Sequence, residues 1–160
     1  MKLKYNIITI ALFGVSLSSC NDFLNQNPQT DLSENDFYKT VADFTSAVNG
    51  AYSALQESNI YGNWYVFAEI PSDNTRNQLS GSVTSQDEFD KFYIDTQNSY
   101  IKDFWTAAYL TINRTNTVLG RIDGIDIDAE LATRYKLECK FIRALMYFNL
   151  VRVYGDVPLV

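Results

Sequence analysis

The chain contains no histidine among its 160 residues. Histidine is the usual general base near neutral pH and the commonest metal ligand, so its absence removes the simplest catalytic and metal-binding schemes. Neighbouring carboxylates could still serve a glycosidase, for example Asp87 with Glu88 or Asp90. These acids lie in a polar stretch where nothing buries them and separates their pKa values. We therefore predict no catalytic residue, no metal site and no cofactor.

Hydrophobic runs are also scarce, because no stretch after residue 20 stays free of charge for the roughly 20 residues that cross a bilayer. The N-terminus differs. Two lysines precede an apolar run over residues 7–15, and Ser18 and Ser19 supply small residues immediately before Cys20. This order is typical of a signal peptide that is cleaved before a lipidated cysteine. We predict a lipoprotein signal peptide over residues 1–19, lipidation of Cys20 and a mature chain anchored to a membrane; an ordinary secretory signal is the alternative.

Only two cysteines are present, so lipidation of Cys20 would leave Cys139 without a disulfide partner. Cys139 lies in a helical pattern beside Leu137 and Ile142, where we expect it to be a small buried hydrophobe. Basic residues are in the minority as well. Removal of the signal peptide leaves 11 of the 13 basic residues against 19 acidic ones, a net charge of −8. Nucleic acid is therefore a poor candidate partner, and an anchor to anionic lipid cannot depend on basic residues.

The remaining sequence predicts helices joined by polar segments. Residues 20–36 have no sustained period and read as a tether. Apolar residues recur at steps of three and four over residues 37–55, after a capping box of Ser33 and Asp36. Residues 61–70 fit either a short helix or a strand, and residues 72–98 read as a long polar loop.

Two further helices are expected in the second half. One begins near Tyr100 and stops before Gly124, and Asp126 or Asp128 caps the next. Apolar residues cover so much of the last helix that it should be buried on several sides, by more protein than this chain supplies. The apolar ending at Leu159 and Val160 also favours a fragment of a longer protein.

Three stretches carry a family resemblance. The mature start reads Cys-Asn-Asp-Phe-Leu at residues 20–24, the first long helix after the loop carries Trp105, Tyr109 and Asn116, and residues 141–159 read Phe-Ile-Arg-Ala-Leu-Met-Tyr-Phe-Asn-Leu-Val-Arg-Val-Tyr-Gly-Asp-Val-Pro-Leu. Their order and spacing resemble the SusD/RagB family of surface lipoproteins.

The resemblance implies an all-α fold of tetratricopeptide-like helix pairs, here truncated and with a long polar loop. It places residues 37–160 in the N-terminal part of a SusD-like helical domain. It also implies a non-catalytic protein on the outer membrane, facing the cell exterior, that captures oligosaccharides or other nutrients. The implied partner is a TonB-dependent, SusC-like transporter. A structural helical-repeat lipoprotein that acts as a protein scaffold is the alternative.

Ligand contacts, if they fall in this portion, are expected on the loop side. Trp64 or Tyr65 could stack on a sugar ring, while Asp73, Asn74 and Arg76 could exchange hydrogen bonds with its hydroxyls. A merely solvated polar loop is the alternative. Trp105 and Tyr109 are expected to pack between helices, and Arg143 to pair with a carboxylate.

Overall fold

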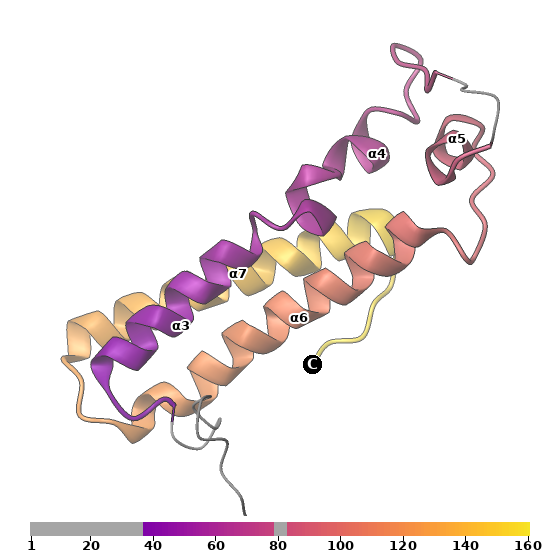
Figure 1. The fold of residues 1–160 in the computed structure, drawn as a ribbon. Coiled ribbons are helices and arrows are strands. Elements are labelled where there is room, and N and C mark those ends of the chain that lie inside the picture. Colours follow the sequence, from indigo (N-terminus) through magenta and orange to yellow (C-terminus); the bar gives the residue numbers. More distant parts are fainter. Residues whose placement is uncertain (1–36, 79–82) are drawn as a thin grey trace, which may run out of the picture. The chain divides into compact units, whose positions relative to one another are not determined.

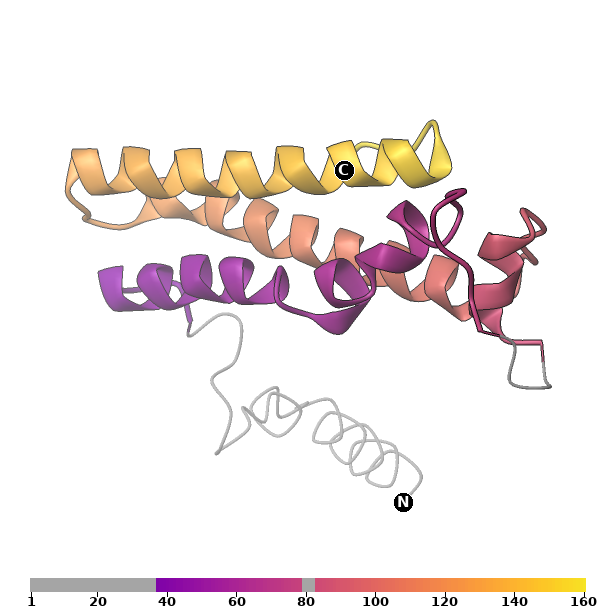
Figure 2. The same ribbon diagram turned by 90° about the horizontal axis from the view of Figure 1, so that it is seen from above.

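In the computed structural model, the described residues are 37–78 and 83–160, and these ranges contain helices and connecting segments but no strand. Three long helices, α3 (Val41–Ala54), α6 (Ser99–Arg121) and α7 (Ala129–Tyr154), lie side by side (Figure 1). Helix α6 runs antiparallel to the other two, and shorter helices gather at one end (Figure 2). The predicted all-helical class is confirmed.

Helix α3 begins later than the sequence pattern predicted. Its N-cap is Thr40, whose hydroxyl accepts a hydrogen bond from the Asp43 amide at 3.2 Å. The Asp43 carboxylate accepts in return from the Thr40 amide at 2.8 Å, which completes a capping box. The expected start at residue 37 is therefore wrong, because residues 37–40 are bends. The predicted box of Ser33 and Asp36 lies outside the described residues.

The α6–α7 pair is the antiparallel helix pair that the family resemblance implies. Asn98 caps α6 by accepting from the Tyr100 amide at 3.0 Å, and Asp128 caps α7 by accepting from two backbone amides. A single 3-10 turn, η2 (Ile122–Gly124), follows α6 where a helix stop was predicted. Helix α7 ends at Gly155, whose φ of 74° suits glycine and turns the chain back.

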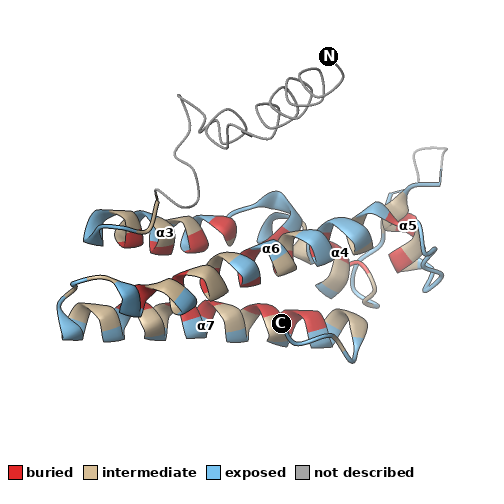
Figure 3. Cartoon of the chain, turned by 90° about the horizontal axis from the view of Figure 1, so that it is seen from below, coloured by how far each residue is buried: buried red, intermediate tan, exposed pale blue. Residues whose placement is uncertain are grey.

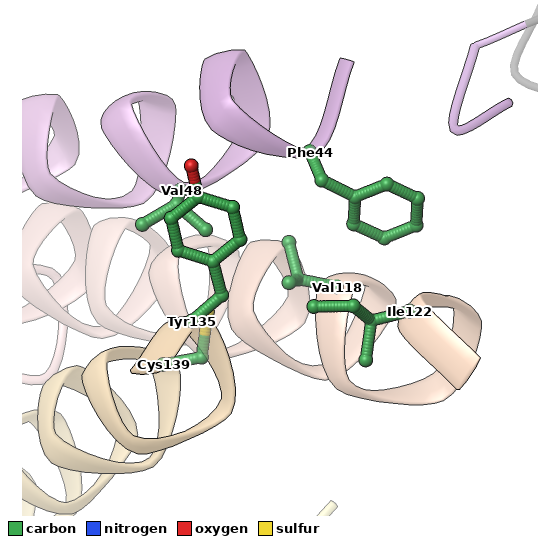
Figure 4. Close-up of a cluster of buried hydrophobic side chains, with 6 residues drawn as sticks. All are labelled: Phe44, Val48, Val118, Ile122, Tyr135 and Cys139. Carbon is green, nitrogen blue, oxygen red and sulfur yellow. The ribbon is translucent and has the colours of Figure 1, made fainter. Parts of the chain in front are cut away.

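Two apolar clusters hold the three long helices together. At one end, α3, α6, η2 and α7 contribute a cluster of side chains that are all buried (Figure 4): Phe44, Val48, Val118, Ile122, Tyr135 and Cys139. Toward the other end, η1 (Ser58–Gly62), α6 and α7 bury Ile60, Phe104, Ala108, Ile112, Met146 and Leu150. Full burial of one large apolar side chain contributes about 1.5–3 kcal/mol, so these clusters dominate the stability of the helical body.

Cys139 confirms its predicted role as a buried hydrophobe. Its side chain is fully buried in the first cluster, and this burial raises the pKa of its thiol to about 11. The thiol is therefore protonated and unreactive at neutral pH.

Burial along α7 differs between its two faces, and the described residues supply only part of the cover that was expected for this helix. One face, which includes Ile142 and Met146, is buried against α6. The opposite face carries large apolar side chains in solvent, among them Leu137, Phe141 and Phe148. Buried and exposed residues accordingly alternate along α7 in Figure 3. Within the described residues nothing covers this second face.

The segment between residues 72 and 98 was predicted as loop throughout, and this prediction is wrong for its middle part. Helix α5 (Ser85–Asp90) lies inside it, and α4 (Trp64–Ala68) precedes it, so the helical alternative for residues 61–70 is confirmed. A third cluster packs Phe89 of α5 against Val66 and Ile70. None of the helices in the described ranges combines the length and apolar character needed to cross a membrane.

Candidate ligand-binding end of the helical domain

Helices α4 and α5 and the start of α6 meet at one end of the domain. The amide of Gln86 on α5 donates to the hydroxyl of Tyr65 on α4 and to that of Tyr100 on α6, both at 2.8 Å. The Gln86 side chain therefore joins α5 to α4 and to the first turn of α6. The Phe89 ring of α5 also packs edge to face against the Phe67 ring of α4, with 5.3 Å between the ring centroids.

Asp87 holds the first turn of α5. The expectation that nothing buries these acids is wrong for Asp87. Its buried carboxylate accepts hydrogen bonds from the Thr84 amide and hydroxyl and, at 2.6 Å, from the Asn77 side-chain amide. The hydrogen bond from the Thr84 amide is the main cause that lowers the pKa of this carboxyl. A glycosidase acid would need a raised pKa instead, so Asp87 is a helix cap and the glycosidase alternative loses its central residue.

A second group of hydrogen bonds, around Asn98 and Glu88, closes the loop after α5. The Asn98 side-chain amide donates to the Ser85 carbonyl and to the Glu88 carboxylate, both at 2.8 Å. The same carboxylate accepts from the Asp95 amide at 2.9 Å. Because Asn98 is buried and also caps α6, residues 85–98 are fixed to the helical body by hydrogen bonds.

Three apolar residues project from this fixed loop, and sequence reasoning missed them. Phe92 and Tyr93 are 78% and 74% exposed, and Ile94 follows them in solvent. Phe92 has a φ of 53°, an unusual value for a residue with a large side chain, and such strain is found where a loop presents residues for binding. A Phe-Tyr pair in an otherwise polar stretch was the signal that could have identified them.

A hollow of about 180 Å³ lies beside the exposed loop. Its one charged lining residue is Arg152, and its other lining residues are Phe67, Pro71, Phe89, Phe92, Ile94, Ile101 and Val153. The guanidinium of Arg152 lies 4.8 Å from the centroid of the Trp64 ring and 4.5 Å from that of Phe148. This hollow therefore combines aromatic walls with a positioned donor.

Trp64, one of the predicted ligand residues, is half-buried in the second cluster. Its ring centroid lies 5.6 Å from that of Phe104 and 6.0 Å from that of Tyr61, and Arg152 covers the ring as described above. These contacts already occupy much of the Trp64 ring. Its role in binding stays a prediction.

The other predicted residues lie at the same end but are not joined. Tyr65 is partly exposed and has its hydroxyl on Gln86. Asp73, Asn74 and Arg76 are exposed, and no hydrogen bond or ion pair connects them to any residue that the structure describes. Cys20, the predicted lipidation site, lies outside the described residues. The ligand contacts of all five and the lipidation of Cys20 stay predictions.

A larger hollow of about 340 Å³ lies between α3, η1 and α6. Charged residues of both signs line it, including Glu57, Lys102, Asp103 and Arg114, and its lining contains no aromatic side chain. Arg114 already donates to the Gly50 carbonyl at 3.2 Å. This hollow therefore lacks the apolar platform that a sugar ring requires. In the described parts of the chain no group of acidic and cysteine side chains could hold a metal ion.

The family-motif residues on α6 and α7 hold the segment after α7. Tyr109 donates to the Pro158 carbonyl at 2.7 Å, and Asn116 donates to the Val160 carbonyl at 3.0 Å. Arg143 donates to the Asn116 side-chain oxygen at 2.7 Å, so the carboxylate partner expected for Arg143 is wrong. The expected interhelical packing is confirmed for Trp105, which contacts Tyr154 of α7 edge to face at 5.0 Å.

Comparison with known proteins agrees with the helical fold and its motifs. Residues 22–160 match the family model described as SusD-like, starch-binding associating with outer membrane. The chain is 31% identical to SusD-like protein P25 of Formosa agariphila over 99% of its length, and 29% identical to SusD-like protein P2 of the same organism over 97%. A SusD-like protein of Bacteroides ovatus is 19% identical over 99%. No solved structure gives a significant match.

These findings define the class first, a helical protein that matches a family described as starch-binding and associating with the outer membrane. The chain belongs to the SusD-like family, because the family model matches nearly its whole length. It spans about 30% of the length of the curated relatives that it matches, namely 30% of P2 and 31% of P25.

Proposed function

We propose that this protein is part of a lipid-anchored, outward-facing outer-membrane protein that captures oligosaccharides or other nutrients and delivers them to a TonB-dependent, SusC-like transporter. The observation that carries the proposal is the match of residues 22–160 to a family described as starch-binding and associating with the outer membrane. The anchor is the acylated Cys20, and stable attachment requires more than one acyl chain. The protein binds and transfers its ligand without catalysis.

The α4–α5 end is the part of this chain that suits a carbohydrate. A pyranose ring offers an apolar face and a rim of hydroxyls, which aromatic rings and planar donors bind together. Phe92 and Tyr93 supply exposed aromatic rings beside a hollow that Arg152 helps to line. The exposed Asn74 and Arg76 add side chains that can donate to hydroxyls.

Isothermal titration with a panel of oligosaccharides tests this proposal. Heat is expected for at least one glycan, and Tyr93→Ala should weaken its binding at least about fivefold, the equivalent of the loss of about 1 kcal/mol or more on truncation of an aromatic anchor. Phe141→Ala is a matched control, because Phe141 is also an exposed ring but lies on α7, away from the loop. An unchanged affinity in Tyr93→Ala would remove the loop from the site, and the absence of heat with every glycan would contradict capture of sugars.

A protein scaffold remains the second candidate, and one observation favours it. Large apolar side chains of α7 face solvent, and such a surface commonly meets another polypeptide. A protein that binds no glycan but co-purifies with an outer-membrane barrel would fit this candidate better.

A further inference from the structure

The exposed face of α7 is an apolar strip that the described part of the chain leaves uncovered. Leu137, Phe141, Ala144, Phe148 and Val151 share this face, since they follow one another at helical steps of three, four and seven residues. Leu137, Phe141 and Phe148 are 59%, 62% and 56% exposed. We name these five residues the outer face of α7.

The segment after α7 extends this apolar surface. Residues 157–160 lie beside both α6 and α7, because Tyr109 and Asn116 of α6 donate to the Pro158 and Val160 carbonyls and Tyr147 of α7 accepts from the Val160 amide at 2.8 Å. Between this segment and the helix lies an open groove of about 480 Å³, lined by Tyr147, Phe148, Val151, Asp156, Val157 and Leu159. The outer face and the groove are therefore continuous through Phe148 and Val151.

Charge at the edges of the outer face indicates what fits it. Lys140 borders one side and Arg152 the other, by their helical positions relative to Phe141 and Phe148. From Cys139 to Gly155 the chain contains no acidic residue, and Asp156 is the one acidic residue that lines the groove. Two copies of α7 packed face to face would oppose cation to cation, which disfavours a second copy as the occupant. An apolar helix face with Asp or Glu at its edges would complement the surface instead.

The length of the relatives identifies a source for such a helix. Because the chain corresponds to about 30% of each SusD-like relative, about two thirds of the relatives' length lies outside the matched segment. We propose that the outer face of α7 and its groove form the surface on which that remaining part of the SusD-like polypeptide packs, through an amphipathic helix with acidic edges. The exposed rings of Phe141 and Phe148 then lie in an internal interface of the whole protein.

Thiol labelling compares the isolated chain with a chimera, in which residues 20–160 replace the matched segment of SusD-like protein P25. Every version carries Cys20→Ala, and Ala144→Cys places a small thiol in the centre of the outer face. A maleimide should modify this position rapidly in the full 160-residue chain and at least about tenfold more slowly in the chimera. Tyr93→Cys is the matched control, because its loop is exposed and should react at similar rates in both.

Cys139 reports folding in every sample, because this thiol is buried and should stay unmodified in a folded helical body. Equal labelling of Ala144→Cys in chain and chimera, with Cys139 protected, would overturn the proposal. Rapid modification of Cys139 in the chimera would overturn it too, since the surface would then fail to accept the family's remaining polypeptide. Protection in the isolated chain that grows with concentration would assign the face to a second copy.

Discussion

The helical body and the α4–α5 end are held together by different forces. In the body, α3, α6 and α7 meet through fully buried apolar side chains such as Phe44 and Phe104. At the α4–α5 end, hydrogen bonds around Asp87 and Asn98 fix the chain while Phe92 and Tyr93 stay in solvent. The comparison indicates that the body tolerates little change in side-chain volume, whereas the loop end can vary its exposed residues without loss of its backbone frame.

The largest expected effect is a loss of stability in the helical body. Phe104→Ala should lower the free energy of unfolding by about 3–5 kcal/mol, because it empties the centre of the second cluster. Phe92→Ala, which truncates the same side chain at an exposed position, should change it by no more than about 0.5 kcal/mol. Urea denaturation followed by circular dichroism measures both, and similar losses in the two variants would contradict the comparison.

An intermediate effect on stability is expected at Asn98, whose hydrogen bonds close the loop after α5. Asn98→Ala removes the cap of α6 and two hydrogen bonds to residues 85–98, and should cost about 0.5–2 kcal/mol. Hydrogen exchange should rise in residues 85–98 and stay slow in the middle of α6. The control is Asn113→Ala, which replaces an exposed asparagine in the same helix. Uniformly faster exchange along α6 would show that the two regions do not respond separately.

The smallest effect is a pH dependence confined to α5. Because the folded state lowers the pKa of Asp87, this carboxylate stabilises α5 above its unfolded pKa of about 3.9. That contribution is lost as the pH falls through the lower, folded pKa. Hydrogen exchange in residues 85–90 should therefore accelerate below about pH 4 relative to the body. Asp87→Asn should remove most of this difference, and an unchanged acid response in that variant would assign it to other groups.

The long helices could be predicted from the sequence because their apolar residues repeat at helical spacing and their ends carry Gly124 as a stop signal and Asp128 as a start signal. Helix α5 could not, since it is six residues long and mostly polar, and only the fold reveals that Phe89 is buried. The start of α3 was predicted too early because Phe37 continues the apolar spacing although its backbone is not helical.

The residues of the candidate site were harder to predict from the sequence than the helices. Residue chemistry selected Trp64 and Tyr65 together, but the fold half-buries Trp64 beneath Arg152 and leaves Tyr65 partly exposed. Neighbouring aromatic residues on a helix point in different directions, and the side that faces the core depends on distant contacts such as the one to Phe104. Likewise, apolar spacing on α7 predicted burial but could not say which polypeptide supplies it.

The length of α6 sets a distance with a consequence for how the molecule is held. At its first turn, Tyr100 bonds to Gln86 of the loop end, and at its last turn the Arg121 guanidinium lies over the Tyr38 ring. Its 23 residues place these points roughly 34 Å apart. The Tyr38 contact and the α4–α5 end are therefore joined by one continuous helix, so a disturbance at either end reaches the other only through the packing of α6.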